Sequence, residues 1–126
     1  MVDVIGYGDR VTQKGLNLLC GPGNDLVSAT ALTAAGAHMI VFTTGRGTPF
    51  GAPAPTLKIS TNTPLAQRKG NWIDFNAGVV ADGTASLQQT AEDLMDLVLE
   101  TASGKQTRSE EKGFREISIF KDGVVL

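Results

Sequence analysis

The chain is poor in the residues that build disulfides and metal centres. Its 126 residues include one cysteine, Cys20, and one histidine, His38. A single cysteine makes no internal disulfide, which favours a reducing, cytoplasmic setting. No His/Cys/Asp cluster with metal-ligand spacing and no Ser–His pair beside a glycine elbow is present. We therefore expect no metal ligands from this chain and not both halves of an acid–base pair.

Strong net charge and long apolar runs are also lacking. Eleven Lys and Arg residues against thirteen Asp and Glu residues give a net charge of −2. This balance provides no basic field for nucleic acid or an anionic membrane. The wholly apolar runs are only a few residues long, so no transmembrane span is expected. The charged residues among the first ten do not fit a signal peptide. Nucleic-acid and membrane partners are therefore not expected.

Glycine is abundant, with 15 residues in clusters, and 41% of the chain is hydrophobic. The length suits one domain that buries its own core. Residues 1–15 are polar with no clear period, so we interpret them as a lead-in or linker before a domain at 16–126.

Short apolar or alternating runs bounded by turn residues predict strands, and apolar residues at helical spacing predict helices. Residues 38–44 lack alternation, which indicates a central parallel strand covered on both faces. Thr63 is the expected cap of a helix with Pro64 in its first turn. The sequence predicts strands at 16–19, 38–44, 56–60, 72–75 and 116–120, and helices at 26–35, 63–69 and 86–102. This alternation predicts a three-layer, Rossmann-like α/β domain with a mainly parallel sheet flanked by helices.

Polar, glycine-rich segments follow several predicted strands. They are residues 20–25, 43–51 and 60–63, with 74–78 as a fourth candidate. In a parallel sheet such segments meet at the carboxyl edge, where ligands bind. We therefore expect a binding site at that edge.

The segment after the second strand is the most informative of these. Glycines let backbone N–H groups approach an anion, threonines add hydroxyls, and the Arg46 guanidinium suits a carboxylate or phosphate. The candidate substrate-binding residues are Thr43, Thr44, Gly45, Arg46, Gly47, Thr48 and Asn62. The alternative is a loop shaped by glycine and proline, with Arg46 in an internal salt bridge. Neither a dinucleotide fingerprint nor a P-loop fits the pattern.

Three further residues are candidates, and the first two also have a structural explanation. Cys20 precedes a predicted helix start, where a thiol becomes more nucleophilic, but a small packing residue explains it equally well. Asn24 is a candidate for holding a substrate hydroxyl or for capping the helix. Asp74 is a candidate acid near the site.

Several segments taken together resemble the C-terminal part of the altronate and galactarate dehydratases. They are Cys-Gly-Pro-Gly-Asn-Asp (20–25), Phe-Thr-Thr-Gly-Arg-Gly-Thr-Pro-Phe-Gly (42–51), Lys-Ile-Ser-Thr-Asn (58–62), Trp-Ile-Asp-Phe-Asn-Ala-Gly (72–78) and Phe-Arg-Glu-Ile-Ser-Ile-Phe-Lys-Asp-Gly-Val (114–124). The resemblance covers nearly the whole chain from Val2. Members of this family are several times longer, so the resemblance implies the C-terminal domain of a larger enzyme.

The resemblance implies a cytoplasmic hydro-lyase of hexuronate catabolism. Altronate dehydratase, which converts D-altronate to 2-keto-3-deoxy-D-gluconate and water, is the expected type, and galactarate dehydratase is the alternative. It implies a divalent metal, Fe²⁺, bound mainly by the preceding part of the enzyme, together with the catalytic base. Arg46 and the loop amides would then bind the substrate carboxylate, and Thr44, Thr48 and Asn62 its hydroxyls. The domain alone would be inactive, and homo-oligomerisation stays open.

Two interpretations from other functional classes also fit the sequence. The Thr-Thr-Gly string (43–45) also resembles the strand-end loop of molybdopterin-binding domains, which would make the chain a cofactor module. The prolines that follow count against that reading. In the other, the chain is an oligomerisation or scaffolding domain whose glycine loops bind nothing.

Overall fold

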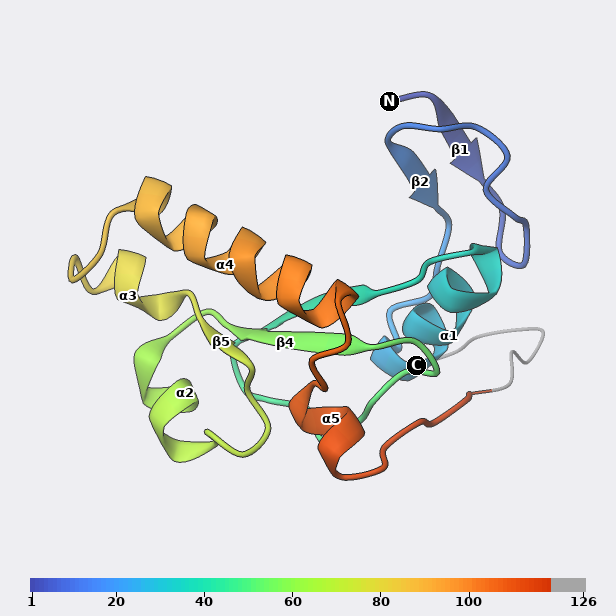
Figure 1. Ribbon diagram of the computed structural model, residues 1–126. Coiled ribbons are helices and arrows are strands. Elements are labelled where there is room, and N and C mark those ends of the chain that lie inside the picture. The colour runs from blue at the N-terminus through green and yellow to red at the C-terminus, as the bar shows by residue number, and fades with distance from the viewer. Residues whose placement is uncertain (119–126) are drawn as a thin grey trace.

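The computed structural model describes residues 1–118 and contains two small parallel sheets with helices around them (Figure 1). Parallel strands with flanking helices confirm the α/β class, while the Rossmann-like label stays a prediction. The elements in chain order are β1 (Asp3–Ile5), β2 (Asn17–Leu19), α1 (Asp25–Ala35), β3 (Ile40–Thr44), β4 (Thr56–Ser60), α2 (Thr63–Arg68), β5 (Phe75–Asn76), α3 (Gly78–Ala81), α4 (Leu87–Ala102) and α5 (Arg108–Glu111).

The larger sheet has the order β3-β4-β5, and all its pairings are parallel. All five residues of β4 are buried because this strand has a neighbour on each side and covered faces. The expectation that residues 38–44 form the central strand is therefore wrong. β3 lies at an edge of the sheet, and Val41 on it is 51% exposed. The buried central strand is the one whose sequence alternates.

The smaller sheet pairs β1 with β2, with Val4 opposite Leu18. Residues 1–15, interpreted as a lead-in, therefore contribute a strand. The run at 16–19 forms a strand as expected, but it joins β1 and not the larger sheet. Figure 1 shows this pair projecting from the rest of the molecule, with the N-terminus at its outer end. The loop after β2 consequently does not follow a strand of the main sheet.

Helix α1 begins and ends where its sequence signals predict. The Asn24 side-chain oxygen accepts hydrogen bonds from the backbone N–H groups of Leu26 and Val27, each at 3.2 Å. Gly36 ends the helix with φ at 115°, a left-handed conformation that glycine adopts without strain. Ala29 on this helix packs into a buried cluster with Ile40 and Phe50. α1 thus covers one face of the larger sheet.

Helix α2 begins one residue earlier than its expected cap implies. The cap is Asn62, whose side-chain oxygen accepts from the Leu65 N–H at 2.9 Å, and Thr63 is already helical. The backbone of Asn62 is extended, which leaves its side chain free to bend back onto the first turn.

The fourth strand, expected at 72–75, is shorter and later in the chain. β5 contains only Phe75 and Asn76, and Trp72 lies in the preceding turn beneath the Lys69 ammonium, 3.9 Å from the centre of its ring. Helix α3 follows directly. A Cβ atom on Gly78 would lie 2.3 Å from the Thr63 nitrogen, so this junction packs tightly against the start of α2.

Helix α4 crosses one face of the larger sheet (Figure 1). Leu94, Leu97 and Val98 are half-buried on its inner side, whereas Leu87 and Met95 are exposed. No helix within residues 1–118 is long and apolar enough to cross a membrane.

The strand expected at 116–120 extends beyond the described residues. Its first part, residues 116–118, forms no strand, and residues 119 and 120 lie outside the described range. Glu116 is nevertheless anchored, because its backbone N–H donates to the Gly51 carbonyl at 2.7 Å.

Candidate functional site at the carboxyl edge of the sheet

The segments that follow β3 and β4 lie side by side. The Thr61 N–H donates to the Thr44 carbonyl at 3.0 Å, and the Asn62 side-chain amide donates to the Gly45 carbonyl at 3.0 Å. The predicted meeting of residues 43–48 with residues 60–62 is therefore confirmed. It follows from the parallel pairing of β3 with β4, which places Thr44 beside Ser60 at the same edge.

The loop after β3 is held from within by Thr44. The Thr44 hydroxyl accepts hydrogen bonds from the backbone N–H groups of Gly47 at 2.9 Å and Arg46 at 3.4 Å. Gly47 has φ at 85°, which is the left-handed conformation this turn requires. The expected cradle of loop amides is therefore incomplete, since these two N–H groups already have an acceptor inside the loop.

The Arg46 side chain lies at the surface of this loop and is exposed. No carboxylate among residues 1–118 lies within ion-pair distance of its guanidinium, since the ion pairs in that range join Lys105 to Glu100 and Arg108 to Glu111. The alternative of an internal salt bridge thus finds no support in the described part of the chain. Arg46, whose guanidinium carries five N–H donors, is exposed close in sequence to the exposed Thr43.

Asn62 and Thr44 have structural tasks at this edge. Both ends of the Asn62 side chain are engaged, one capping α2 and the other holding the Gly45 carbonyl. Its geometry explains the close approach of the two loops without any ligand. Among the other predicted site residues, Arg46 and Thr43 are exposed and Thr48 is half-buried.

A second part of the predicted site gathers at the start of α1. A pocket of about 370 Å³ joins this helix end to the loop after β3 and is lined by Asn24, Asp25, Leu26, Thr48, Pro49, Phe50 and Glu116. Segments 20–25 and 43–51 therefore meet here, as the sequence predicted. Cys20 does not line this pocket: it is exposed, and its N–H continues the β1–β2 ladder to the Ile5 carbonyl.

Asp74 lies apart from these loops and is half-buried. Its two carboxylate oxygens accept the backbone N–H groups of Lys58 at 2.8 Å and Arg108 at 2.7 Å. Burial raises the pKa of the Asp74 carboxyl, while these hydrogen bonds and the nearby cations oppose the rise. The interpretation of Asp74 as an acid at the loop edge finds no geometric support, since its carboxylate ties β4 to α5.

Lys58 is a buried cation that the sequence analysis did not select. It is 1% exposed, and its ammonium lies 5.4 Å from the centre of the Phe50 ring. Burial lowers the pKa of Lys58, and the carboxylates of Asp74 and Glu116 oppose this shift. Its position in an alternating strand suggested an outward side chain. Phe50 in the loop before this strand packs against its ammonium, and the carboxylates of Asp74 and Glu116, which come later in the sequence, lie near it.

The described residues do not offer a metal site of their own. Within residues 1–118, no three His, Cys, Asp or Glu side chains gather closely enough to hold a metal ion. The donor set of these residues therefore does not fit a complete Fe²⁺ site.

Comparisons with known proteins identify the family. The sequence model described as "D-galactarate/Altronate dehydratase, C-terminal" matches residues 1–125. The chain is 52% identical to altronate dehydratase from Escherichia coli and 46% identical to altronate dehydratase from Bacillus subtilis, in each case over 100% of this chain and 25% of that protein. It is 38% identical to galactarate dehydratase (L-threo-forming) from Escherichia coli over 99% of this chain and 24% of that protein.

The chain spans about a quarter of the length of these curated relatives. The matching family model covers almost every residue and is itself described as C-terminal. This chain therefore belongs to the D-galactarate/altronate dehydratase family and corresponds to its C-terminal part.

Proposed function

We propose that this chain is the C-terminal domain of an altronate dehydratase, an enzyme that converts D-altronate to 2-keto-3-deoxy-D-gluconate and water in the cytoplasm. The higher identity to two altronate dehydratases than to a galactarate dehydratase supports this substrate. Galactarate is the alternative substrate. Family membership favours a dehydratase over a molybdopterin-binding module or a scaffolding domain.

The proposed role of the domain is to bind the substrate through the loop edge. Arg46 pairs with the carboxylate of the sugar acid, and the hydroxyls of Thr43 and Thr48 contact hydroxyls of the substrate. The observation that carries this role is the exposure of Arg46 on a loop that hydrogen bonds of Thr44 and Asn62 hold in place. A rigid support lowers the entropy that a loop loses when its arginine takes up a ligand.

The chemistry explains why a cation is needed there. Removing the proton next to the carboxylate leaves an enediolate, whose negative charge rests largely on the carboxylate oxygens. The electron pair then expels the neighbouring hydroxyl, which leaves as water once an acid has protonated it, and the enol becomes the 2-keto acid. A guanidinium on the carboxylate stabilises the developing charge more than the starting anion. The base, the acid and the Fe²⁺ ligands belong, in this proposal, to the preceding part of the enzyme.

Replacing Arg46 in the full-length enzyme tests the proposal. We expect Arg46→Ala to lower kcat/KM by about 30-fold or more, which corresponds to a loss of at least about 2 kcal/mol. Arg46→Lys should recover only part of this loss, because an ammonium lacks the two-pronged geometry of guanidinium. Kinetics with altronate and with galactarate measure both the loss and the substrate preference.

Arg68→Ala provides the matched control, since Arg68 is another exposed arginine on the neighbouring helix α2. Its kinetics should match the wild type. If Arg46→Ala also leaves kcat/KM unchanged, Arg46 does not bind substrate. The 126-residue chain alone should show no dehydration of either acid with Fe²⁺ added. Clear turnover by this chain would contradict the proposal that the base, the acid and the Fe²⁺ ligands lie in the preceding part of the enzyme.

A further inference from the structure

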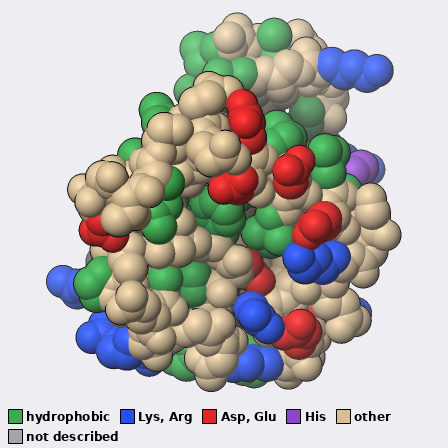
Figure 2. All heavy atoms as spheres, turned by 60° about the vertical axis from the view of Figure 1, so that its left-hand side comes forward, with side chains coloured by type: hydrophobic (Ala, Val, Ile, Leu, Met, Phe, Trp, Pro, Cys, Tyr) green, Lys and Arg blue, Asp and Glu red, His purple; other side chains and the backbone are tan. Residues whose placement is uncertain are grey.

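The pair β1–β2 carries an apolar surface that nothing in the described chain covers. On the side facing away from α1, Val2, Val4 and Leu18 are 45%, 62% and 47% exposed. Leu16, which also borders the pocket on the α1 side, is 64% exposed. Val4 and Leu18 lie opposite each other in the register, and Val2 and Leu16 continue the same side of the two strands. Figure 2 shows hydrophobic side chains open to solvent in the projecting upper part of the molecule. We call these four residues the outer β1–β2 face.

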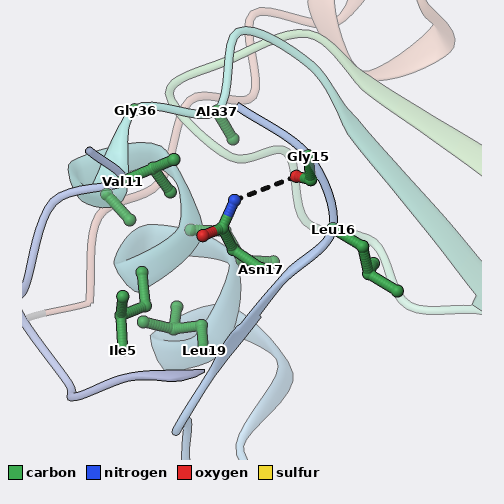
Figure 3. Close-up of a pocket in the computed structure, with 10 residues that line it drawn as sticks. Ile5, Val11, Gly15, Leu16, Asn17, Leu19, Gly36 and Ala37 are labelled. Carbon is green, nitrogen blue, oxygen red and sulfur yellow. Dashed lines mark hydrogen bonds between the residues drawn. The ribbon is translucent and has the colours of Figure 1, made fainter. Parts of the chain in front are cut away.

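The opposite side of the pair is covered, although loosely. Ile5 and Leu19 face α1 across a pocket of about 330 Å³ (Figure 3). Asn17 projects into the same space, and its amide nitrogen donates to the Gly15 carbonyl at 2.9 Å. Its side-chain oxygen is buried and accepts no hydrogen bond within residues 1–118. Within residues 1–118, the outer face therefore lacks apolar packing contacts, and the Asn17 oxygen lacks the hydrogen bond that buried polar atoms normally have.

Parallel strands are normally buried on both faces, which is why they are apolar on both. β1 and β2 carry apolar residues on both sides, with Asp3 and Asn17 also on the inner side. Within residues 1–118, α1 with Val11 and Ala37 covers the inner side alone. Among residues 1–118 each of these strands also has a single neighbour, which leaves one edge of each strand unpaired in that range. The sequence of this pair is thus suited to a second covering layer.

The relatives indicate what that layer is. This chain matches a quarter of their length, and the matching part is C-terminal, so most of each relative precedes the position of residue 1. Residue 1 lies at the outer end of β1, beside Val2 (Figure 1). A preceding segment enters the domain at the outer β1–β2 face and meets it at an effective concentration on the order of millimolar. Four side chains are few beside the roughly 20–30 residues a side that hold two separate chains together.

We propose that the outer β1–β2 face is the docking surface for the preceding part of the dehydratase chain, which packs apolar side chains onto Val4 and Leu18. This inference rests on family membership and is independent of which sugar acid is the substrate. It makes the β1–β2 pair a joint between the C-terminal domain and the rest of the enzyme.

Photo-crosslinking in the full-length dehydratase tests the proposal. Val4 and Leu18 are replaced, one at a time, by the photoreactive amino acid p-benzoylphenylalanine, and peptide mass spectrometry maps the crosslinks. We expect both positions to join peptides that precede this domain in the same chain, with a yield at least fivefold above that of a control position. The control is Asp96, an exposed residue on α4.

Circular dichroism of each variant verifies folding, and the second position keeps the test decisive if one variant does not fold. Yields at positions 4 and 18 equal to that at Asp96 would overturn the proposal, because the face would then be open. Crosslinked dimers that disappear on dilution would overturn it as well, since a second copy would be the occupant. The readout needs no substrate, so it stands even if Arg46→Ala leaves the kinetics unchanged.

Discussion

The two sheets of this molecule use the same kind of pairing and reach different degrees of burial. β4 has all five residues buried, with a strand on each side and covered faces. The β1–β2 pair has one covered face and one apolar face in solvent. The larger sheet therefore has its buried core within this chain, whereas the smaller one leaves apolar side chains exposed, where we propose that the preceding part of the dehydratase packs. The comparison separates residues that stabilise the domain from residues that join it to its enzyme.

A substitution at Gly78 should have the largest effect on the larger sheet. A Cβ atom there would lie 2.3 Å from the Thr63 nitrogen and 2.5 Å from backbone atoms of Asn62. Because these are backbone atoms, the junction has to move, and we expect Gly78→Val to cost about 3 kcal/mol or more of the free energy of unfolding. Urea unfolding of the 126-residue chain, followed by circular dichroism, measures the loss.

Gly23→Ala is the matched control for Gly78. Gly23 belongs to the loop between β2 and α1, and a Cβ there would meet no atom within 4 Å. The unfolding midpoint of this variant should remain near that of the wild type. Equal losses in the two variants would mean that the tight junction at Gly78 does not govern stability.

A pair of alanine substitutions compares the two sheets directly. Ile59 in β4 is 4% exposed, so Ile59→Ala should cost about 2–5 kcal/mol in the 126-residue chain. Leu18→Ala should cost less than about 0.5 kcal/mol in the same chain, because Leu18 is 47% exposed. In the full-length enzyme the cost of Leu18→Ala should rise, while that of Ile59→Ala stays similar. If Leu18→Ala costs the same in both contexts, the smaller sheet does not depend on outside contacts.

Asp74→Asn should have an intermediate effect that depends on pH. The carboxylate accepts two backbone N–H groups, and an asparagine would leave one of them facing its own NH₂ group. We therefore expect a cost of about 1–3 kcal/mol near neutral pH. Urea unfolding across a pH series measures it.

The pH dependence follows from the direction of the pKa shift. Burial raises the pKa of Asp74 above its ordinary 3.8, so the folded chain binds this proton more tightly than the unfolded chain. The resulting contribution to stability is fully present below pH 3.8 and is lost as the pH rises through the raised pKa. The gap in stability between the wild type and Asp74→Asn should therefore be widest below pH 3.8 and narrow above it. Parallel pH profiles of the two proteins would contradict this assignment.

Local signals in the sequence were sufficient where a feature depends on a few neighbouring residues. The start of α1 at Asn24 and its end at Gly36 were predicted because capping acts within one turn. The meeting of the loops at Arg46 and Asn62 was also predicted, because parallel strands bring their carboxyl ends together.

Features that depend on contacts between distant residues could not be predicted from the local sequence. The sequence of β4 alternates like a half-exposed strand, yet Lys58 is buried because Phe50 and the segment around Asp74 cover it. β1 lies in a stretch without clear periodicity, and its pairing with β2 spans the loop between them. An asparagine that follows a strand fits both a helix cap and a ligand contact, so the pattern at Asn62 did not show that its side chain caps α2 and holds the Gly45 carbonyl.

The position of Trp72 makes its fluorescence sensitive to the loop that carries Arg46. It is the only tryptophan of the chain, and its ring lies 3.9 Å from the place where a Cβ on Gly47 would be, beneath the charge of Lys69. Indole emission responds to nearby charge and to displacement of adjacent groups. A shift of the loop that carries Arg46 should therefore change the wavelength or the intensity of Trp72 fluorescence. Binding of an anion at this loop could then be followed by intrinsic fluorescence, without an added label.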